Sequence, residues 1–383
     1  MDKLMKIMFV FGTRPEAIKL APLIKKLPNS VVCVTGQHKE MLQQVLKIFN
    51  IKPKYDLKIM RRNQSLFNIT SNILLKLESI LRKEKPNIII VQGDTTTTFA
   101  GSLCAFYLKI PVGYIEAGLR SNNKYQPFPE EINRRLTTHL SDIHFAPTSM
   151  AKNNLLKEGV HPKQIFVTGN TAIDALLMTV EKVREDDLKY KRYFCENFGI
   201  NFNKKIILIT GHRRENFGIG FKNICKAIKE IALKEDVSLV YPVHLNPNVQ
   251  RPVKEILSNL KNIFLLPPLE YDKFCYLMFK SYLILTDSGG IQEEAPSLGK
   301  PVLVLRDVTE RQEGVKAGKA VLVGTDRNKI IKWATKLLHN KRLYNKMSNA
   351  NNPYGDGKAT ERIVKILKNT KNILQRLHFK NSC

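Results

Sequence analysis

Three acidic residues stand at or just after the ends of predicted strands: Asp94 in IIIVQGDTTTT, Glu116 in VGYIEAGLRS and Glu130 in QPFPEEINRR. An open α/β sheet builds its reaction site at the carboxyl ends of its parallel strands. Several carboxylates at that edge can move protons on and off two faces of a substrate. A structural alternative is that Asp94 caps the helix that follows it and that Glu130 and Glu131 charge another helix N-terminus. Because all three acids follow apolar strands, the sequence favours a catalytic set.

Basic side chains follow the first predicted strand, in FVFGTRPEAIKLAPLI. Gly12 and Thr13 form a turn, and Arg14 then stands at a helix N-terminus, where a guanidinium and the helix dipole together suit phosphate. Lys19 lies further along the same helix, and a plain surface position is the alternative for it. The turn has neither the glycine fingerprint of dinucleotide-binding folds nor a P-loop, so neither of those chemistries is supported.

The second half of the chain has a comparable turn in ITGHRRENFG. His212 and Arg213 follow a predicted strand and a glycine there. An imidazole beside arginines can neutralise a diphosphate leaving group as its charge develops. This pattern favours a functional histidine over a structural one.

A glycine-rich turn in LILTDSGGIQEEAPSLGKP opens another predicted helix. Its backbone N–H groups at Ser288, Gly289 and Gly290 form a cradle for an anion. Glu294, one turn into the helix, is placed to accept both hydroxyls of a ribose. Arg311 is near enough in sequence to assist, although a position at the rim is the alternative. Together these residues predict a site for a nucleotide sugar.

The elements that would position these residues alternate between short apolar strands and helical patterns. Such alternation predicts parallel sheets covered on both faces. A charged helical stretch at 181–203 suggests the connection between two halves. We therefore predict an α/β protein with two Rossmann-like domains facing across a deep cleft. The N-terminal domain, at 1–175, carries the acidic residues; the nucleotide-binding domain is at 176–357; a helix at 358–383 packs back on the N-terminal domain. The predicted strands are 7–11, 31–35, 88–92, 112–115, 143–146, 165–168, 206–210, 239–243, 263–266, 282–286, 301–305 and 320–323.

Composition excludes several classes of protein. The 383 residues are 43% hydrophobic and 25% charged, as in an ordinary globular protein. Six scattered cysteines argue against a disulfide framework or a cysteine-built zinc site. No apolar run approaches the ~18 residues of a membrane span and no signal peptide precedes the first strand, so we expect a cytoplasmic protein without membrane contact. The formal net charge of +28 suits an anionic small substrate, and no nucleic-acid recognition motif accompanies it.

Taken together, the motifs resemble the non-hydrolysing UDP-N-acetylglucosamine 2-epimerase family. The resemblance implies a GT-B-like pair of Rossmann-type domains and a homodimer. It also implies an isomerase that interconverts UDP-GlcNAc and UDP-ManNAc by eliminating UDP to a glycal and adding it back, with no NAD and no metal. Such an enzyme supplies precursors for surface polysaccharides or glycans. The matching blocks run from residue 12 to about 325: GTRPEAIKLAPL, VQGDTTTT, YIEAGLRS, PFPEEINRR, GNTAIDAL, TGHRREN, YPVHLNPNV and TDSGGIQEEAPSLGKPVLVLRDVTERQEG.

The resemblance also implies roles for individual residues. Asp94, Glu116 and Glu130 would divide the proton transfers, with their assignment to the two faces of the sugar left open. His212 would lie against the diphosphate. Arg134, four residues after Glu130, would orient that carboxylate or bind phosphate. Ser288, Gly289 and Glu294 match the positions that hold diphosphate and ribose. The other substrate-binding positions come from the turns described above: Arg14, Lys19, Arg213, Gly290 and Arg311.

Bacterial members of this family carry a second UDP-GlcNAc site that activates the reverse reaction. The resemblance assigns Gln37, Gln64 and His244 to it. Where the family has Q-H-x-Q-M and R-Q-[TS]-L, this chain has QHKEM and NQSL, so Glu40 replaces a glutamine and Asn63 an arginine. Both changes weaken a site for an anionic ligand, and we expect weaker or absent allosteric activation.

Three alternatives remain open at the level of sequence. A GT-B glycosyltransferase shares the folds and the nucleotide cradle but has no need of three carboxylates. A hydrolysing epimerase would release free ManNAc and UDP. A basic nucleic-acid-binding protein would bind random DNA in a salt-dependent manner even when saturated with UDP-GlcNAc.

Overall fold

The computed structural model describes residues 5–36, 39–61 and 64–369, and the chain separates into two units. Unit 1 comprises Met1–Ala175 and Gly355–Cys383, and unit 2 comprises Leu176–Tyr354. The chain therefore crosses between the units twice, and a returning segment completes unit 1. Each unit has its own parallel sheet and its own hydrophobic core.

Over its described residues, unit 1 contains a seven-stranded parallel sheet with the order β3-β2-β1-β4-β5-β6-β7. The chain starts in the centre, moves to one edge and then returns to build the other edge, which is the doubly wound order of a Rossmann fold. The order reverses between β1 and β4, where such sheets place their ligands. The strands are β1 (Ile7–Phe11), β2 (Val31–Val34), β3 (Tyr55–Asp56), β4 (Ile88–Gln92), β5 (Val112–Ile115), β6 (Ile143–Ala146) and β7 (Ile165–Val167).

Helices follow the strands of unit 1. The first, α1, begins directly after the turn that leaves β1, and Pro15 occupies an early helical position, where its missing N–H leaves no bond unmade. The last described helix, α16, contacts α1, and the N–H of Thr360 bonds the buried Asp174 at 2.7 Å. The helices are α1 (Arg14–Lys26), α2 (Lys39–Ile48), α3 (Leu66–Glu84), α4 (Thr96–Tyr107), α5 (Glu130–Leu140), α6 (Ser149–Lys157), α16 (Ala359–Lys368) and α7 (Thr171–Glu185), which continues into unit 2.

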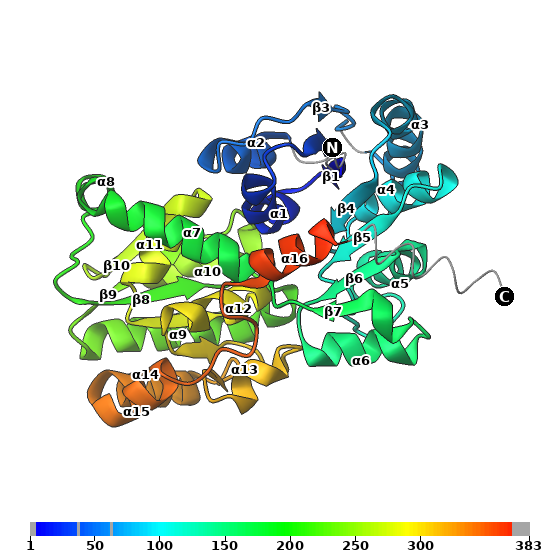
Figure 1. Ribbon diagram of the computed structural model, residues 1–383. Helices are drawn as coiled ribbons and strands as arrows, with labels where there is room; N and C mark the ends of the chain where they lie inside the picture. The colour runs from blue at the N-terminus through cyan, green and yellow to red at the C-terminus, as the bar shows by residue number, and fades with distance from the viewer. Residues whose placement is uncertain (1–4, 37–38, 62–63, 370–383) are drawn as a thin grey trace. The chain divides into compact units, whose positions relative to one another are not determined.

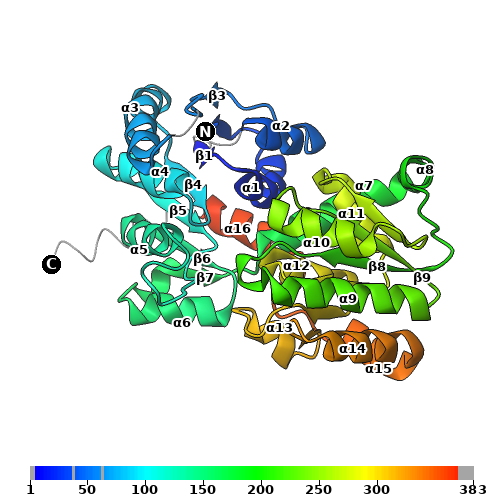
Figure 2. The same ribbon diagram turned by 180° about the vertical axis from the view of Figure 1, so that it is seen from behind.

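Unit 2 repeats the same strand order, β10-β9-β8-β11-β12-β13, again all parallel. In Figures 1 and 2, α7 and α11 lie on one face of this sheet, and α9 and α14 lie on the other. The strands are β8 (Lys205–Thr210), β9 (Val237–Pro242), β10 (Ile263–Leu266), β11 (Leu283–Thr286), β12 (Val302–Val304) and β13 (Ala320–Leu322). The helices are α8 (Asp187–Phe198), α9 (Ile219–Lys234), α10 (Pro247–Leu257), α11 (Tyr271–Lys280), α12 (Gly289–Glu294), α13 (Gln312–Lys316), α14 (Arg327–His339) and α15 (Lys341–Ser348).

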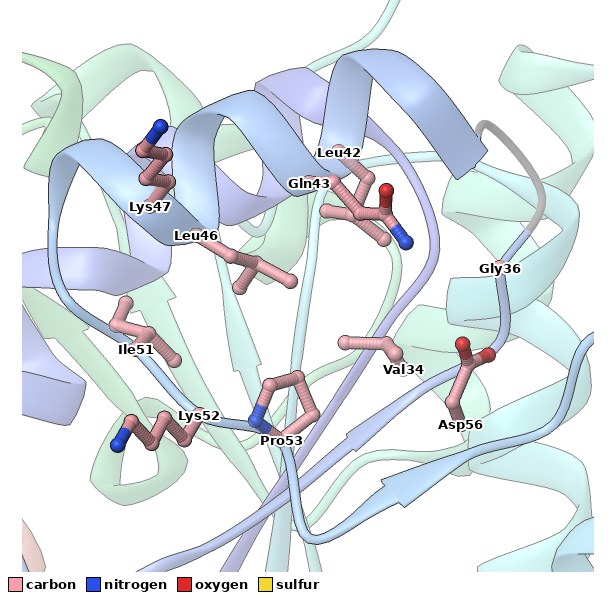
Figure 3. Close-up of a pocket in the computed structure, with 10 residues that line it drawn as sticks. All are labelled: Val34, Gly36, Leu42, Gln43, Leu46, Lys47, Ile51, Lys52, Pro53 and Asp56. Atoms are coloured by element: carbon pink, nitrogen blue, oxygen red, sulfur yellow. The ribbon is translucent and has the colours of Figure 1, made fainter.

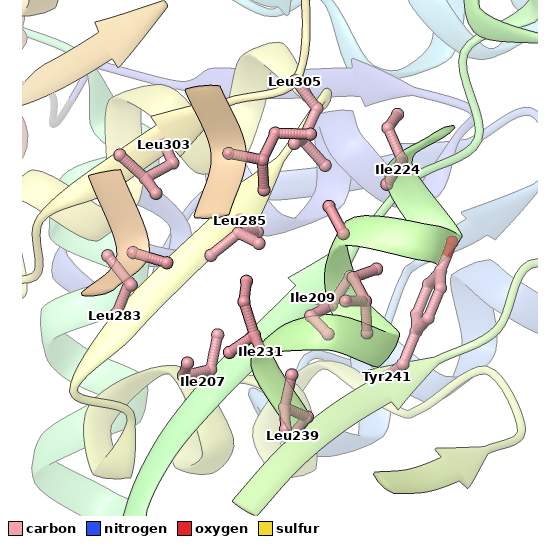
Figure 4. Packing of buried hydrophobic residues seen from close by; sticks show 14 of the residues in the cluster. Ile207, Ile209, Ile224, Ile231, Leu239, Tyr241, Leu283, Leu285, Leu303 and Leu305 are labelled. Carbon is pink, nitrogen blue, oxygen red and sulfur yellow. The ribbon is translucent and has the colours of Figure 1, made fainter. Parts of the chain in front are cut away.

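The core of unit 2 shows how strand alternation builds one apolar face (Figure 4). Ile207 and Ile209 of β8 point to the same side, and the register pairs them with Leu283 and Leu285 of β11. Ile231 of α9 packs in the same cluster, and all five side chains are fully buried. Burying such a side chain contributes about 1.5–3 kcal/mol. The central strands are thereby fixed, and with them the turns at their ends.

This architecture confirms the predicted α/β class with two Rossmann-like units. The structure adds β3, a two-residue strand with no apolar run to reveal it. The charged stretch at 181–203 contains the end of α7 and all of α8, and it belongs to unit 2. In the part of the chain that the structure describes, no helix is both long and apolar enough to cross a membrane.

Candidate active site

A buried carboxylate, that of Glu16, holds the turn after β1. Its Oε2 accepts hydrogen bonds from the backbone N–H groups of Gly12 and Thr13, at 3.0 and 2.7 Å. Its Oε1 accepts hydrogen bonds from the hydroxyls of Thr95 and Thr98, at 2.7 and 3.1 Å. Burial raises the pKa of Glu16, and these hydrogen bonds oppose that rise. Glu16 therefore ties the turn after β1 to the turn after β4.

Glu116 follows β5 and meets a lysine from α1. The ammonium of Lys19 contacts Oε2 of Glu116, and the amide of Gln92 donates to the same oxygen at 2.7 Å. The backbone of Glu116 has a φ of +66°, a left-handed conformation that costs a non-glycine residue roughly 1–2 kcal/mol. Strain of this kind persists only where the surrounding structure enforces it, and it concentrates at functional sites.

Asp94 follows β4 and is held from α5. Arg134 donates two hydrogen bonds to Oδ2 of Asp94, from Nε at 3.0 Å and from Nη2 at 2.6 Å. Asn133 donates to the backbone carbonyl of Asp94 at 2.9 Å. The helix-cap alternative for Asp94 is wrong, because the hydroxyl of Thr95 caps α4 by accepting the N–H of Thr98. The carboxylate of Asp94 is oriented by a guanidinium and stays 31% exposed.

The two acids at the start of α5 have different surroundings. Glu131 is fully buried; its Oε2 accepts the N–H of Ser121 at 2.9 Å and lies 3.3 Å from Nη1 of Arg134. Although burial raises the pKa of Glu131, these partners hold it below its usual value. Glu130 is half-buried, and its Oε2 accepts no hydrogen bond from the described residues. The guanidinium expected to orient Glu130 bonds Asp94 and Glu131 instead.

Tyr114, in β5, places a buried hydroxyl close to these acids. Its side chain is fully buried, and within the described residues its hydroxyl has no hydrogen-bond partner. Burial raises the pKa of Tyr114 strongly, and the charges of Asp94 and Glu116 raise it further. The hydroxyl is therefore neutral, and it interacts electrostatically with both carboxylates.

In unit 2, the turn after β8 is built on the carboxylate of Asp287, at the end of β11. The N–H groups of His212 and Arg213 both donate to Oδ2 of Asp287 at 2.9 Å. Tyr241, from β9, donates its hydroxyl to the carbonyl of Gly211 at 3.0 Å. The main chain at His212 is thus fixed from two neighbouring strands.

The side chain of His212 lies between an acid and a second histidine. Its Nδ1 is 3.6 Å from Oδ1 of Asp287. Its ring stacks on that of His244, with 5.3 Å between the centroids and an interplanar angle of 16°. Burial lowers the pKa of His212; Asp287 opposes this effect, whereas His244 and Arg213 add to it. His244, assigned to the second site by resemblance, therefore lies directly against the proposed catalytic histidine.

The glycine-rich turn after β11 lies under an arginine. A Cβ added to Gly289 would stand 3.0 Å from Cζ of Arg311, so only glycine allows this approach without displacing the guanidinium. Arg311 also donates to Glu293 from Nε at 2.9 Å. Gly290 is exposed, with nothing within 4 Å of the position that a Cβ would take. Glu294 is half-buried at the end of α12.

Three further predicted positions are Arg14, Gln64 and Gln37. Arg14 is half-buried as the first residue of α1. Oε1 of Gln64 accepts the N–H of Arg61 at 3.2 Å, a local contact. Gln37 lies outside the described residues. Within the described ranges, no group of three or more His, Cys, Asp or Glu side chains is arranged to hold a metal ion.

A separate cavity of about 400 Å³ lies beneath α2, against the β2–β3 edge of unit 1 (Figure 3). Its walls are mostly apolar, including Val34, Leu42, Leu46 and Pro53, and Asp56 lines it near Gly36. None of the predicted catalytic side chains lines this cavity.

Sequence reasoning missed three side chains that, within their own unit, hold or adjoin predicted site residues. Glu16 carried a signal, because the Thr-x-x-Glu spacing at the start of α1 is that of a capping box. Asp287 stood within a motif but had no role assigned to it. Tyr114 carried no signal, since a tyrosine in an apolar strand usually belongs to the core.

The chain is similar in sequence to known proteins of one family. The model of the family described as UDP-N-acetylglucosamine 2-epimerase matches residues 24–368. A protein of Campylobacter jejuni named UDP-N-acetylglucosamine 2-epimerase is 54% identical over 376 residues, covering 96% of this chain and 98% of that protein. The protein of that name from Escherichia coli (strain K12) is 55% identical over 374 residues, covering 96% and 99%.

Solved structures give the same result. The crystal structure of UDP-GlcNAc 2-epimerase from Neisseria meningitidis bound to UDP-GlcNAc has a TM-score of 0.86 and 55% identity, covering 95% of this chain and 99% of that one. The Methanocaldococcus jannaschii enzyme in complex with UDP-GlcNAc and UDP has a TM-score of 0.77 and 40% identity, covering 95% and 99%. The GT-B-like two-domain fold expected from the sequence is the fold of these neighbours.

Proposed function

Because the chain belongs to the UDP-N-acetylglucosamine 2-epimerase family, we propose that it interconverts UDP-GlcNAc and UDP-ManNAc by inverting carbon 2 of the sugar. Relatives crystallised with UDP-GlcNAc and with UDP support this choice of substrate. The observation that carries the proposal is the set of acids in unit 1. Asp94 and Glu116 are held by cations, and one oxygen of Glu130 accepts no hydrogen bond from any residue that the structure describes.

The reaction changes bonds at two neighbouring carbons. The hydrogen on C2 is not next to a carbonyl group, so it becomes removable only as the bond between C1 and the diphosphate oxygen breaks. A carboxylate takes the C2 proton, the electrons of the C–H bond form a C1=C2 double bond, and UDP leaves with the electrons of the C1–O bond. The resulting glycal takes a proton on the opposite face of C2 while UDP adds back to C1. Protons and electrons balance without an oxidant or reductant.

In unit 1, Asp94, Glu116 and Glu130 share the two proton transfers. Such a transfer needs the acid and the carbon within roughly 3 Å, so the orientation of each carboxylate matters. Arg134 orients Asp94, and Lys19 orients Glu116. Arg14, at the start of α1, binds phosphate.

In unit 2, the residues after β8 and β11 hold the nucleotide. His212 and Arg213 stabilise the charge that develops on the departing diphosphate. The N–H groups at Ser288, Gly289 and Gly290 bind it together with Arg311, and Glu294 accepts the ribose hydroxyls. A donor that acts mainly on charge in the transition state is worth about 3–4 kcal/mol, or 10²–10³-fold in rate.

Exchange of the C2 hydrogen in deuterated water tests the proposal. Incubation with UDP-GlcNAc alone is expected to place deuterium at C2 and to form UDP-ManNAc. Asp94→Asn, Glu116→Gln and Glu130→Gln are each expected to lower kcat by about 10²–10⁴-fold, the usual contribution of general acid–base catalysis. Glu78→Gln, at a half-exposed carboxylate of α3, is the matched control and should keep the wild-type rate.

Each alternative gives a different result in the same assay. Full activity in all three carboxylate variants would overturn the mechanism. Stoichiometric release of free UDP would identify a hydrolysing epimerase. A glycosyltransferase would leave the C2 hydrogen of UDP-GlcNAc in place and would react only with an added acceptor.

The proposal extends to assembly, location and regulation. We expect a cytoplasmic homodimer that supplies ManNAc-type precursors for surface polysaccharides or glycans. We also expect weak or absent activation by UDP-GlcNAc, because Glu40 and Asn63 replace a glutamine and an arginine of the family's second site. Strongly sigmoidal UDP-ManNAc kinetics that UDP-GlcNAc abolishes would contradict this expectation.

A further inference from the structure

The two carboxylate oxygens of Asp287 differ in the hydrogen bonds that they accept. Oδ2 accepts three hydrogen bonds, from the N–H groups of His212 and Arg213 at 2.9 Å and from Nδ2 of Asn216 at 3.3 Å. Oδ1 is buried, and it accepts no hydrogen bond from the residues that the structure describes. One oxygen shapes the turn after β8, and the other retains the capacity to accept a further donor.

The imidazole of His212 lies against this second oxygen. Its Nδ1 is 3.6 Å from Oδ1 of Asp287, longer than a hydrogen bond but close enough for a small ring movement to form one. Nε2 is separated from Nδ1 by one ring carbon, and its N–H or lone pair is directed away from that of Nδ1. The His212 side chain is 40% exposed, whereas Asp287 is fully buried. One side of the His212 ring therefore faces the buried carboxylate of Asp287, while part of the ring is exposed to solvent.

The surroundings of His212, burial first among them, favour a neutral ring in the free protein. Burial lowers its pKa, Asp287 raises it, and His244 and Arg213 lower it. A diphosphate at Nε2 would add negative charge on the side opposite Asp287. An imidazolium between two anions is favoured over a neutral ring. Nucleotide binding would thus bring one proton from solvent onto His212.

We infer that Asp287 is a positioning residue for His212: with UDP bound, Oδ1 accepts Nδ1–H of the imidazolium, and Nε2–H is donated to the diphosphate. The inference rests on the proposed function, because it takes UDP as the ligand. A neutral ring protonated at Nδ1 would offer the phosphate only a lone pair at Nε2. The imidazolium instead supplies a donor that gains strength as the C1–O bond breaks and charge grows on UDP.

Asp287→Asn separates the two contributions of the carboxylate. Its amide oxygen is expected to replace Oδ2, because an NH₂ group cannot face three N–H donors. The NH₂ group then points at Nδ1 of His212 and makes that nitrogen an acceptor, which prevents formation of the imidazolium. The substitution therefore keeps the turn after β8 and removes the negative charge of residue 287. Asp236→Asn, at an exposed acid of the same unit, is the matched control.

Nitrogen-15 NMR of the histidine side chains in the whole protein measures the protonation state of His212. Its signal is identified as the one that is missing in His212→Gln. In the wild type, UDP is expected to raise the pKa of His212 by about one unit or more. In Asp287→Asn this rise should disappear. The Kd for UDP should then increase, by up to about tenfold for each pKa unit lost when it is measured at a pH below the pKa of free His212. Asp236→Asn should behave as the wild type.

Two results would overturn the inference and leave the epimerase proposal standing. One is a pKa of wild-type His212 that does not rise when UDP binds. The other is an equal UDP-induced rise of the His212 pKa in Asp287→Asn and in the wild type. Failure of the wild type to bind UDP would overturn both. If Asp287→Asn does not fold, the wild-type measurement decides, since it needs no change at Asp287.

Discussion

At the scale of single residues, two carboxylates of unit 1 are held by cations of different shape. The planar guanidinium of Arg134 donates two hydrogen bonds to Asp94. The ammonium of Lys19 meets Glu116 as a point charge. A guanidinium fixes the orientation of a carboxylate more closely than an ammonium does. Asp94 therefore depends on the shape of its partner as well as on its charge.

Arg134→Lys tests this dependence, because it keeps the charge and removes the paired donors. We expect kcat to fall by about tenfold or more while the fold is retained, since Asp94 loses its orientation. Arg135→Lys is the matched control: Arg135 is the next residue of α5 and also contacts Glu131. Steady-state kinetics of both variants measure the difference. Equal losses would mean that the effect passes through Glu131 and not through Asp94.

His144, in β6, links the stability of unit 1 to pH. Its side chain is 1% exposed, and Nε2–H donates to the carbonyl of Thr138 at 2.9 Å. Burial lowers the pKa of His144 to about 4, from an ordinary value of 6.5. Between these values the unfolded chain binds a proton that the folded protein does not. This contribution to stability is therefore complete above pH 6.5 and declines as the pH falls toward 4.

We expect about 3 kcal/mol of stability to be lost through His144 between pH 7 and pH 4. His144→Gln, whose amide can still donate to Thr138, should lose correspondingly less over this range. Urea denaturation followed by circular dichroism at several pH values measures the loss. His161→Gln, at an exposed histidine of the same unit, should match the wild type. A His144→Gln variant as sensitive to acid as the wild type would exclude His144 as the cause.

At the scale of strands and helices, the strands that carry the site were predictable and the contacts between their turns were not. The strands before Asp94 and Glu116 are buried on both faces, which leaves a continuous apolar run in the sequence. Glu16 shows its local role as a capping pattern, but its partner Thr95 lies 79 residues away. No local pattern encodes a hydrogen bond between two turns, because only the assembled sheet brings them together.

The same limit applies in unit 2. The position of His212 after a strand and a glycine indicated a functional histidine. Its stacking on His244 depends on the lateral pairing of β8 with β9, which no spacing in the sequence reveals. Family resemblance named both histidines, yet it assigned them to different sites.

Gly118, in the turn after β5, shows how closely one turn packs against a helix. Its φ is +90°, and an added Cβ would stand 2.2 Å from the backbone carbonyl oxygen of Ala151 in α6. We expect Gly118→Ala to destabilise unit 1 by about 2–4 kcal/mol, through both the left-handed backbone and the clash. Gly159→Ala is the matched control, with a φ of +84° and nothing within 4 Å, and should cost only about 1 kcal/mol. Equal shifts in urea denaturation would show that α6 yields to the new methyl group.

At the scale of the whole molecule, both units have a buried carboxylate at the point where the strand order reverses. In unit 1, Glu16, in the first turn of α1, accepts hydrogen bonds from N–H groups of the turn after β1 and from hydroxyls at the start of α4. In unit 2, Asp287 from the turn after β11 reaches N–H groups in the turn after β8. Each buried carboxylate ties together the turns that follow two adjacent central strands. These turns carry predicted site residues, so in each unit the hydrogen bonds fix the main chain around those residues.

The discontinuity of unit 1 makes its stability depend on the end of the described chain. Ile363 and Leu367 of α16 are fully buried, and α16 contacts α1. Unit 2 carries Trp333, the single tryptophan of the chain, in α14. Tryptophan fluorescence therefore reports the unfolding of unit 2 alone, whereas circular dichroism reports both units.

The double variant Ile363→Ala, Leu367→Ala should destabilise unit 1 selectively, since each truncation of a buried aliphatic side chain costs about 2–5 kcal/mol. We expect circular dichroism to show a new transition at low urea concentration, while the fluorescence of Trp333 changes only at the wild-type midpoint. Ile330→Ala, a fully buried position of α14, is the matched control and should shift the fluorescence transition instead. If the α16 variant moved both signals together, the two units would unfold as one cooperative body, and the closing helix would stabilise the whole chain.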